Sequence, residues 1–305
     1  MCVFMTGGTG FVGSALTKKL TKQGHAVTLL TRKIRKNRSV PPGVSMVEGN
    51  PIEPGAWQKK VADHEVIINL AGASIFRRWT DAEKRRIHDS RIQTTMNLVH
   101  ALERRKGLKT TLLNASAVGY YGFHGDETLN EESPPGEDFL ASVAREWEET
   151  ALKAEPLGVR VLLCRFGIVL GSGGGALGEM IPIFNKGLGS PLGSGRQWFS
   201  WIHQMDLVRV FLFLMEREDL SGPFNCTAPG PVRNKDLTEA LGEALGKPTF
   251  MPSVPGFVIR MIKGEFGNVL LKGQKVRPEK LLNAGFHFQH PDLLSALRDL
   301  ILPAP

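Results

Sequence analysis

The sequence predicts an α/β protein built on a doubly wound parallel sheet, with a smaller, mostly helical C-terminal lobe. Three observations predict this fold class. Short apolar runs alternate with helix-like stretches over the first 115 residues, a glycine cluster directly follows the first apolar run, and the sequence becomes richer in glycine, proline and lysine after Gly171. Strands and helices that alternate at this spacing form parallel sheets, because each helix carries the chain back to the same edge.

The apolar runs and the helical periodicities place the elements in order. Gly13–Gln23 has leucines at helical spacing and is followed by Gly24, a residue suited to end a helix. Arg91–Arg104 repeats apolar residues on one helical face. The strand candidates are Cys2–Thr6, Ala26–Thr31, Val44–Glu48, Val66–Ala71, Thr111–Ala115 and Val159–Phe166.

The C-terminal lobe is predicted from glycine-rich loops and short amphipathic segments. Asp206 is placed to N-cap an apolar helix that runs to Glu216, and this helix is expected to return to the first domain. The helix-like segments of the lobe are Met180–Asn185, Asn234–Leu245 and Pro291–Leu300. The first domain is therefore assigned to residues 1–170 with a return segment at 199–228, and the lobe to residues 171–198 and 229–305.

Composition excludes several classes of protein. The content of 42% hydrophobic and 22% charged residues is that of a globular chain. No apolar run approaches the ~18–20 residues that span a bilayer, and the opening strand leaves no room for a signal peptide, so we expect no membrane partner. Three isolated cysteines, Cys2, Cys164 and Cys226, form neither a disulfide framework nor a metal motif. This cysteine usage predicts a reducing, intracellular and most simply cytoplasmic location.

The positive charge raises nucleic acid as a partner, since the net charge is +8 and the isoelectric point about 9.5. The charge is unevenly spread, however: residues 32–38 carry five cations and no acid, whereas residues 126–149 carry nine acids and one cation. Aromatic residues do not alternate with the cations, as they do in many nucleic-acid modules. We therefore expect a small-molecule substrate and no specific nucleic-acid partner.

A glycine turn between the first strand and the first helix is the strongest signal of function. Gly7 and Gly8 permit a tight turn, Gly10 lets the backbone approach a pyrophosphate, and Gly13 lets the helix pack closely on the strand. The start of the helix then offers amide hydrogens and a positive dipole to the phosphates. The turn predicts dinucleotide binding by Thr6, Gly7, Gly8, Thr9, Gly10, Phe11, Val12 and Gly13.

The end of the second strand favours NADP over NAD. An NAD site has an acid there to bind the ribose hydroxyls, but this strand ends in Thr31 and Arg32. A guanidinium can bind the 2′-phosphate of NADP through two hydrogen bonds. A solvated basic loop is the alternative interpretation, and it suits Arg35, Lys36 and Arg38 better than Arg32.

The sequence resembles the extended short-chain dehydrogenase/reductase superfamily, and within it the "epimerase family protein" branch of NADP-dependent oxidoreductases. The resemblance covers essentially the whole chain. It rests on Thr6–Gly13, Asn69–Ala73, Arg78–Thr80, Ser90–Arg91, Ser116–Gly122, Glu132–Pro135, Arg165–Gly167 and Gly285–Phe286.

The resemblance implies a Rossmann-type fold and further cofactor contacts at the ends of later strands. Arg77 and Arg91, the latter in place of the relatives' helix asparagine, are implied at the cofactor site, where they can lower the pKa of a phenol or hold an acidic substrate. Arg77 and Arg78 can equally bind cofactor phosphate or stay solvated. The remaining implied contacts are Asn50, Pro51, Ile52, Leu70, Ala71, Gly72, Gly167, Ile168 and Val169.

The chemistry of the resembling family is incomplete in this chain. Active relatives use a tyrosine and a lysine four residues later to exchange a proton with the substrate, but Phe139 and Val143 stand at those positions. Ser116 is retained and would orient the substrate. Tyr120 and Tyr121 follow it, either as a substitute acid or as the wall of a pocket.

The sequence gives little support to a hydrolase or to a metal site. The sequence contains no Gly-x-Ser-x-Gly motif of a hydrolase, and His287 and His290 have no neighbouring ligand at metal-site spacing, so no metal is expected. Trp198, Trp201 and His203 are expected to line the substrate pocket or to pack between the domains.

Two functions remain open. The first is an NADP-dependent oxidoreductase that acts on an unidentified small carbonyl or alcohol. The second is a non-catalytic protein that senses NADP(H) on behalf of a partner protein and has lost the tyrosine–lysine pair.

Overall fold

A seven-stranded parallel sheet forms the centre of the protein in the computed structural model, which describes residues 1–34, 40–104 and 109–301. The strand order is β11-β7-β5-β4-β1-β2-β3, so the chain starts in the middle of the sheet and winds outward in both directions. The predicted α/β class and Rossmann-type sheet are confirmed. The strands are β1 (Cys2–Thr6), β2 (Ala26–Thr31), β3 (Val44–Glu48), β4 (Val66–Asn69), β5 (Thr110–Ala117), β7 (Val159–Phe166) and β11 (Gly222–Cys226).

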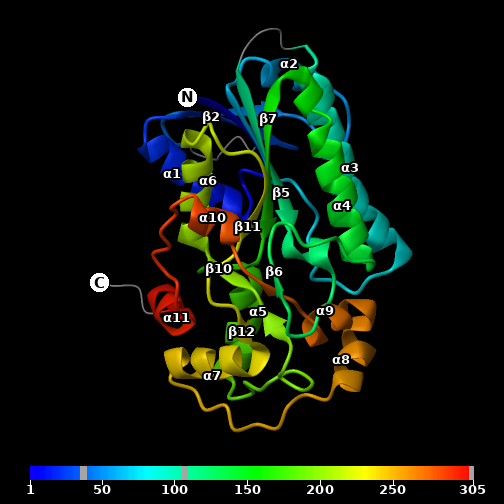
Figure 1. The fold of residues 1–305 in the computed structure, drawn as a ribbon, viewed down its shortest axis with the longest axis vertical. Coiled ribbons are helices and arrows are strands. Elements are labelled where there is room, and N and C mark those ends of the chain that lie inside the picture. The colour runs from blue at the N-terminus through cyan, green and yellow to red at the C-terminus, as the bar shows by residue number, and fades with distance from the viewer. Residues whose placement is uncertain (35–39, 105–108, 302–305) are drawn as a thin grey trace.

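Helices cover both faces of the sheet (Figure 1). On one face lie α1 (Phe11–Lys22) and α6 (Gln204–Glu216), and on the other α3 (Asp81–Leu102) and α4 (Phe139–Leu152), with the short α2 (Gln58–Val61) beside α3. Alternation along β1 explains the two layers: Val3 and Met5 belong to the hydrophobic cluster of α1 and α6, whereas Phe4 packs with Leu98 of α3.

Most C-terminal elements gather at the other end of the molecule, below the sheet in Figure 1, whereas α10 lies beside the edge strand β11. Helices α5, α7 and α11 share a hydrophobic cluster that includes Leu177, Leu237 and Leu297. The helices are α5 (Gly175–Asn185), α7 (Asn234–Leu245), α8 (Gly256–Lys263), α9 (Gly267–Leu271), α10 (Glu279–Asn283) and α11 (Leu293–Ile301). Short strands link them: β6 (Thr128–Leu129), β8 (Ile168–Leu170), β9 (Trp198–Phe199), β10 (Trp201–His203), β12 (Val232–Arg233) and β13 (Lys275–Val276).

Most predicted elements are present, with differences at their ends. Helix α3 begins ten residues before the predicted Arg91, because Thr80 caps it by accepting a hydrogen bond from the backbone N–H of Glu83. The edge strand β11 was not predicted. The division of the chain into two domains stays a prediction.

The prediction that Asp206 caps α6 is wrong. The N-cap is His203, whose Nδ1 accepts a hydrogen bond from the backbone N–H of Met205. Asp206 is buried and accepts the backbone N–H groups of Gln289 and His290 instead. An acid in the first turn therefore ties the C-terminal segment to α6.

Among the described helices, none has the length and apolar character needed to cross a membrane. Arg35, Lys36 and Arg38, interpreted above as a solvated basic loop, lie outside the described residues.

Candidate functional site

The turn between β1 and α1 has the geometry of an anion-binding cradle. Gly7 has φ +68°, and a Cβ on it would lie 2.6 Å from the carbonyl carbon of Leu70. A Cβ on Gly13 would lie 2.3 Å from the carbonyl oxygen of Gly7, so the helix touches the turn with no room for a side chain. Gly10 is the N-cap and provides no capping side chain. The first amide groups of α1 are thus left to a ligand, and an anion suits them.

Polar side chains of three neighbouring strands, β1, β4 and β5, are hydrogen-bonded to one another beside this cradle. The Thr6 hydroxyl donates to Asn69 Oδ1 (2.6 Å) and accepts from the backbone N–H of Ala71 (3.2 Å). Asn69 Nδ2 donates to Asn114 Oδ1 (2.7 Å). Thr6 therefore stabilises the turn through its hydrogen bonds to Asn69 and to the backbone of Ala71. Neither Asn69, the last residue of β4, nor Asn114, three residues before the end of β5, was predicted as a site residue, although an asparagine within each of two buried strands is a visible signal.

The rest of the turn contacts the core and a second glycine loop. Gly8 is buried against Leu29, Thr9 is exposed, and Val12 packs on the core of α1 and α6. A Cβ on Gly171, Gly174 or Gly175 would lie within 2.9 Å of the Phe11 ring. The glycine-rich loop 171–175 therefore lies across the start of α1, where glycines let it approach closely.

Two exposed cations, Arg32 and Lys33, follow the carboxyl end of β2, which faces one acid. Arg32 is exposed, and no ion pair joins it to another residue of the described ranges. The Thr31 hydroxyl donates to the carbonyl oxygen of Lys33 (3.3 Å). Thr31 pairs in register with Glu48 of β3, whose Oε2 accepts the backbone N–H of Ile34 (3.0 Å). Glu48, which the sequence analysis missed, adds a negative charge close to the predicted 2′-phosphate position.

The segment after β3 lies at the same edge of the sheet. Asn50 Nδ2 donates to Glu53 Oε1 (2.8 Å), the carbonyl oxygen of Pro51 accepts from Asn97 (2.9 Å), and Ile52 is exposed. Its conformation is therefore held by local hydrogen bonds, with the apolar side chain of Ile52 open to a ligand.

The segment after β4 places a guanidinium beside small residues. Arg91 of α3 donates to the carbonyl oxygens of Ala73 (3.2 Å) and Ile87 (2.9 Å), and a Cβ on Gly72 would lie 3.3 Å from its guanidinium carbon. Burial lowers the pKa of Arg91 to about 10. No carboxylate pairs with it in the part of the chain that the structure describes, so a bound anion would fit here. Arg77 is exposed nearby in sequence, in the same loop as Gly72.

Ser116 and Tyr121 are engaged in a buried polar network. The Ser116 hydroxyl donates to Glu148 Oε1 (2.6 Å), and Arg165 holds both oxygens of Glu148 (2.8 and 2.7 Å). Arg165 also donates to the Tyr121 hydroxyl (2.9 Å), which itself donates to Asn225 (2.7 Å). Tyr121 is 0% exposed, and burial raises its pKa to about 12. Both hydroxyls are committed to internal partners, which argues against direct contact with a substrate.

Tyr120 lies differently. It is half-buried on the short 3₁₀ turn that follows β5, and the Arg165 guanidinium stands 3.6 Å from its ring centroid. Of the three residues predicted for catalysis, Tyr120 is the one whose side chain is not enclosed.

The start of α4, where relatives would place tyrosine and lysine, is apolar. Phe139 is the first residue of the helix and contacts Trp79 edge-on (ring centroids 5.2 Å apart). Trp79 in turn contacts Phe266 (5.8 Å), and Val143 is buried. An aromatic cluster thus takes the place of the usual proton relay.

Gly167 joins the sheet to the C-terminal elements. Its N–H donates to the carbonyl oxygen of Cys226 (3.0 Å), and a Cβ would lie 2.8 Å from the carbonyl oxygen of Ser200. Ile168 and Val169 continue into β8, which pairs with β10, and Ile168 is partly exposed. This crossing holds the start of α6 close to the carboxyl edge of the sheet.

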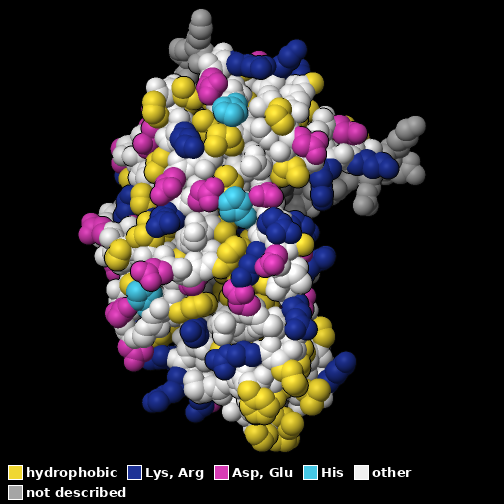
Figure 2. All heavy atoms as spheres, turned by 90° about the vertical axis from the view of Figure 1, so that its right-hand side faces the viewer, with side chains coloured by type: hydrophobic (Ala, Val, Ile, Leu, Met, Phe, Trp, Pro, Cys, Tyr) yellow, Lys and Arg dark blue, Asp and Glu magenta, His cyan; other side chains and the backbone are white. Residues whose placement is uncertain are grey.

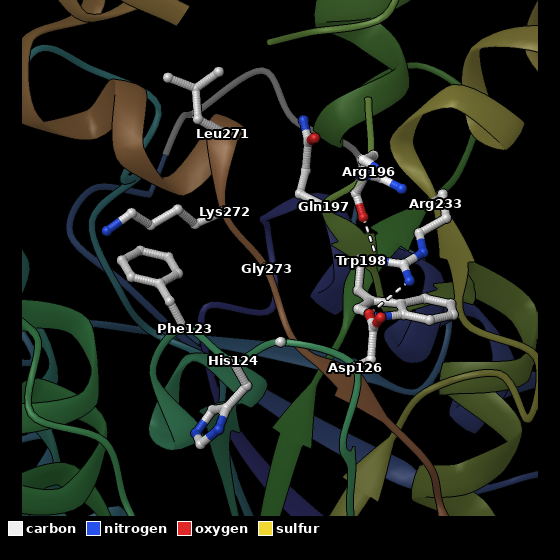
Figure 3. A pocket seen from close by; sticks show the side chains of 11 residues that line it. Phe123, His124, Asp126, Arg196, Gln197, Trp198, Arg233, Leu271, Lys272 and Gly273 are labelled. Atoms are coloured by element: carbon white, nitrogen blue, oxygen red, sulfur yellow. Dashed lines mark hydrogen bonds and ion pairs between the residues drawn. The ribbon is translucent and has the colours of Figure 1, made fainter. Parts of the chain in front are cut away.

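A cavity of about 380 Å³ opens between the loop after β5 and the C-terminal elements (Figure 3). Arg233 pairs with Asp126 (2.6 Å) and stands 3.8 Å from the Trp198 ring centroid. The lining includes three cations and one acid, so the cavity has a positive potential suited to an anion. Its lining residues are Phe123, His124, Gly125, Asp126, Arg196, Gln197, Trp198, Arg233, Leu271, Lys272 and Gly273.

Only one of the three residues expected at the substrate pocket lines this cavity. Trp198 does so, but Trp201 is fully buried and donates to the carbonyl oxygen of Gly230 (3.0 Å). His203 is also buried, where it caps α6. The interpretation as inter-domain packing fits Trp201 and His203 better.

One group of side chains in the described ranges has the composition of a metal site: His203, His290 and Asp299 offer ligand atoms within 4.8 Å of one another. Their arrangement opposes coordination. His203 Nδ1 accepts a backbone N–H, so the proton of the neutral ring is on Nε2, the atom that faces Asp299 (3.3 Å). The ring of His290 also stacks on that of His203 (centroids 3.8 Å apart) rather than converging with it on one point.

Comparison with known proteins agrees with this geometry. Residues 3–226 match the NAD dependent epimerase/dehydratase family, and residues 254–300 match a domain of unknown function, DUF1731. The chain is 41% identical to the epimerase family protein SDR39U1 homolog, chloroplastic, of Arabidopsis thaliana, over 99% of this chain and 87% of that protein. It is 39% identical to the epimerase family protein YfhF of Bacillus subtilis, over 99% and 98%.

Solved structures give the same result. The human epimerase family protein SDR39U1 (isoform 2) with NADPH superposes with a TM-score of 0.86 at 32% identity, covering 100% of both chains. A nucleoside-diphosphate sugar epimerase from Corynebacterium glutamicum gives 0.80 at 32% identity, covering 99% of this chain and 58% of that one. The resemblance in sequence is therefore confirmed, and the chain belongs to the NAD dependent epimerase/dehydratase family, with its NAD(P)-binding fold.

Proposed function

We propose that this chain is an NADP(H)-dependent oxidoreductase that acts on a small, anionic carbonyl or alcohol substrate. The observation that carries the proposal is the cradle at the start of α1, where Gly7 and Gly13 bring backbone amides together without a capping side chain. A pyrophosphate supplies the negative charge that these amides lack.

The choice of NADP over NAD rests on Arg32. Its guanidinium lies at the end of β2, free of ion pairs within the described ranges, where an NAD site would carry an acid. The human relative of 32% identity was solved with NADPH, which supports the same choice. Glu48 opposes it, and so the preference is expected to be moderate.

The proton of the reaction is assigned to Tyr120. When bound, NADP(H) supplies or accepts the hydride at the substrate carbon. During reduction, the Tyr120 hydroxyl gives its proton to the carbonyl oxygen, and Arg165 stabilises the phenolate that remains, at 3.6 Å from the ring. Ser116, held by Glu148, keeps Arg165 and the loop in place and does not touch the substrate.

The substrate's anionic group is assigned to the cavity beside this loop. The loop from Phe123 to Asp126 lines the cavity, and the His124 ring contacts the backbone carbonyl oxygen of Tyr121 (2.7 Å), which links the cavity wall to the tyrosine pair. Arg196 and Lys272 line it without a carboxylate partner among the described residues.

A second function, NADP(H) binding without turnover, is favoured by one specific observation. Phe139 and Val143 occupy the positions of the relay, and Phe139 is packed against Trp79. A chain that only senses the cofactor would need the cradle and no proton donor.

An activity assay distinguishes the two functions. Small carbonyl compounds bearing a carboxylate or phosphate are tested as substrates, and turnover is measured as the loss of NADPH absorbance. We expect turnover that falls by about a hundredfold in Tyr120→Phe, with NADPH affinity unchanged in a parallel titration. Tight NADPH binding with no turnover above that of Tyr120→Phe would instead establish the sensor.

A further inference from the structure

Helix α8 and the loop before it expose an apolar surface, called here the α8 surface, made of Phe250, Met251, Phe257, Met261 and Ile262. Their exposed fractions are 80%, 37%, 70%, 68% and 61%. Four of them are the most exposed large hydrophobic side chains in the described ranges. Figure 2 shows hydrophobic side chains gathered at the lower end of the molecule, the end at which α8 lies in Figure 1.

Helix α8 exposes these apolar side chains although its inner face is packed against the rest of the protein. Ile259 is buried and points toward the protein, and α8 packs on α9. A Cβ on Gly267 would lie 3.2 Å from the Cα of Arg260 and from the carbonyl oxygen of Ile259, so the two helices meet closely. With its inner face fixed in this way, α8 presents Phe257, Met261 and Ile262 outward on one side. Contiguous exposed apolar surface of this kind marks an interaction site.

The charged residues in the segment that carries this surface are all cations. Between Lys247 and Gly264 the chain carries the cations Lys247, Arg260 and Lys263, all exposed, and no acid. The next acid, Glu265, is paired with Lys84. Lys247, Arg260 and Lys263 have no ion-pair partner among the described residues, so this apolar surface with nearby cations is complementary to a partner that is apolar inside and negative at its boundary.

We propose that the α8 surface docks on a lipid membrane with anionic headgroups. Aromatic and aliphatic side chains on one side of a short helix, with Lys and Arg beside them, are the features of a helix that lies in the membrane interface. The apolar side chains form a projecting end of the molecule, which suits a soft planar surface. This proposal departs from the expectation of no membrane partner, which was based on the lack of a spanning segment and of a signal peptide; docking of a surface helix needs neither.

The proposal is tested by flotation of the full-length protein with vesicles. Vesicles of phosphatidylcholine with about one third phosphatidylserine should carry the protein upward, and vesicles of phosphatidylcholine alone should not. The double variant Phe257→Ser, Met261→Ser should partition about tenfold less. Both residues are exposed, so the fold should persist. Leu157→Ser, an exposed apolar residue far from α8 in sequence, is the matched control and should bind like wild type.

The charge contribution is tested separately. Lys263→Glu should weaken binding several-fold, and added salt should weaken the wild type but affect the variant less. Equal binding to neutral vesicles, or binding to neither kind, would overturn the proposal. Concentration-dependent dimerisation that is lost in the Phe257→Ser, Met261→Ser variant, without vesicle binding, would overturn it in favour of an interface between copies of the chain.

Discussion

Two turns at the same edge of the sheet, the β1–α1 turn and the segment from β5 to α4, differ in how they use their residues. The β1–α1 turn relies on backbone geometry, because Gly7 and Gly13 leave no room for side chains. The β5–α4 segment relies on side chains, and those of Ser116 and Tyr121 are hydrogen-bonded inside the protein. The backbone cradle of the β1–α1 turn is thus formed, whereas the β5–α4 segment buries Ser116 and Tyr121 in a polar network and has apolar Phe139 and Val143 at the positions of the usual proton relay.

The cradle and the positions of the usual proton relay are therefore built by different means in this fold. The cradle depends on glycines that any member of the family needs for the same steric reason. The relay depends on ionisable groups, and here the buried Arg165–Glu148 pair, 2.7 Å apart, stands behind the loop that carries both tyrosines. We interpret this pair as the support of the β5–α4 segment.

The largest effect is expected from breaking that pair. Glu148→Gln leaves the Arg165 guanidinium buried without its partner and should lower the free energy of unfolding by about 3–5 kcal/mol. Glu149→Gln, next in sequence but in an exposed pair with Arg145 at 3.9 Å, should change it by less than about 0.5 kcal/mol. Urea denaturation measures both. Similar small losses in the two variants would mean that the network is not structural.

A pH effect on stability is expected from His203, the buried N-cap of α6. Burial, and then the charge of His290, lowers its pKa from 6.5 to about 4. Between these two values the unfolded chain binds the proton and the folded chain does not, so stability falls as the pH falls from about 6.5 to about 4. The loss attributable to His203 should reach about 3 kcal/mol.

The matched variant is His203→Asn, which keeps an acceptor for the cap of α6 but does not titrate. Its free energy of unfolding should depend less on pH over this interval than that of the wild type. Parallel pH profiles for the two proteins would show that His203 is not the group that titrates.

The cradle is tested by steric substitution. Gly7→Val places a Cβ 2.6 Å from the Leu70 carbonyl carbon and should weaken NADPH binding by at least about a hundredfold. Gly24→Val has a similar positive φ of 82° but open space around it, so it shares the backbone strain without the clash. NADPH affinity close to that of the wild type is expected for Gly24→Val. An equal loss of NADPH affinity in both variants would contradict the assignment of the β1–α1 turn as the cofactor-binding turn.

The sequence predicted the β1–α1 turn well because its function lies in residue type at fixed spacing. It predicted the β5–α4 segment less well, because Ser116 and Tyr121 have the right chemistry at the right strand end but point into the protein. Only their partners decide this, and Glu148, Arg165 and Asn225 are distant in sequence.

The local sequence also could not predict the roles of His203 and Glu48. A histidine before an apolar helix resembles a pocket residue, yet here it caps the helix. Glu48 ends its own strand, and only the parallel register with β2 places it opposite Thr31. Contacts that depend on strand register or on residues far apart along the chain cannot be predicted from local sequence pattern.

The smallest effect is expected from Glu48. Removal of its charge in Glu48→Gln should strengthen NADPH binding by a few-fold and leave NADH binding nearly unchanged, because only NADPH carries the 2′-phosphate. Fluorescence titration of both cofactors measures the change. A gain shared equally by NADH would place Glu48 away from the 2′-phosphate.

The most direct test of the proposed cofactor site is calorimetric titration of the wild type and Arg32→Ala with NADPH and NADH. We predict that the wild type binds NADPH at least about tenfold more tightly than NADH. We also predict that Arg32→Ala loses about tenfold to a hundredfold in NADPH affinity alone, as expected for one guanidinium–phosphate contact. Equal wild-type affinities for the two cofactors, or an Arg32→Ala variant that binds NADPH as the wild type does, would contradict this prediction.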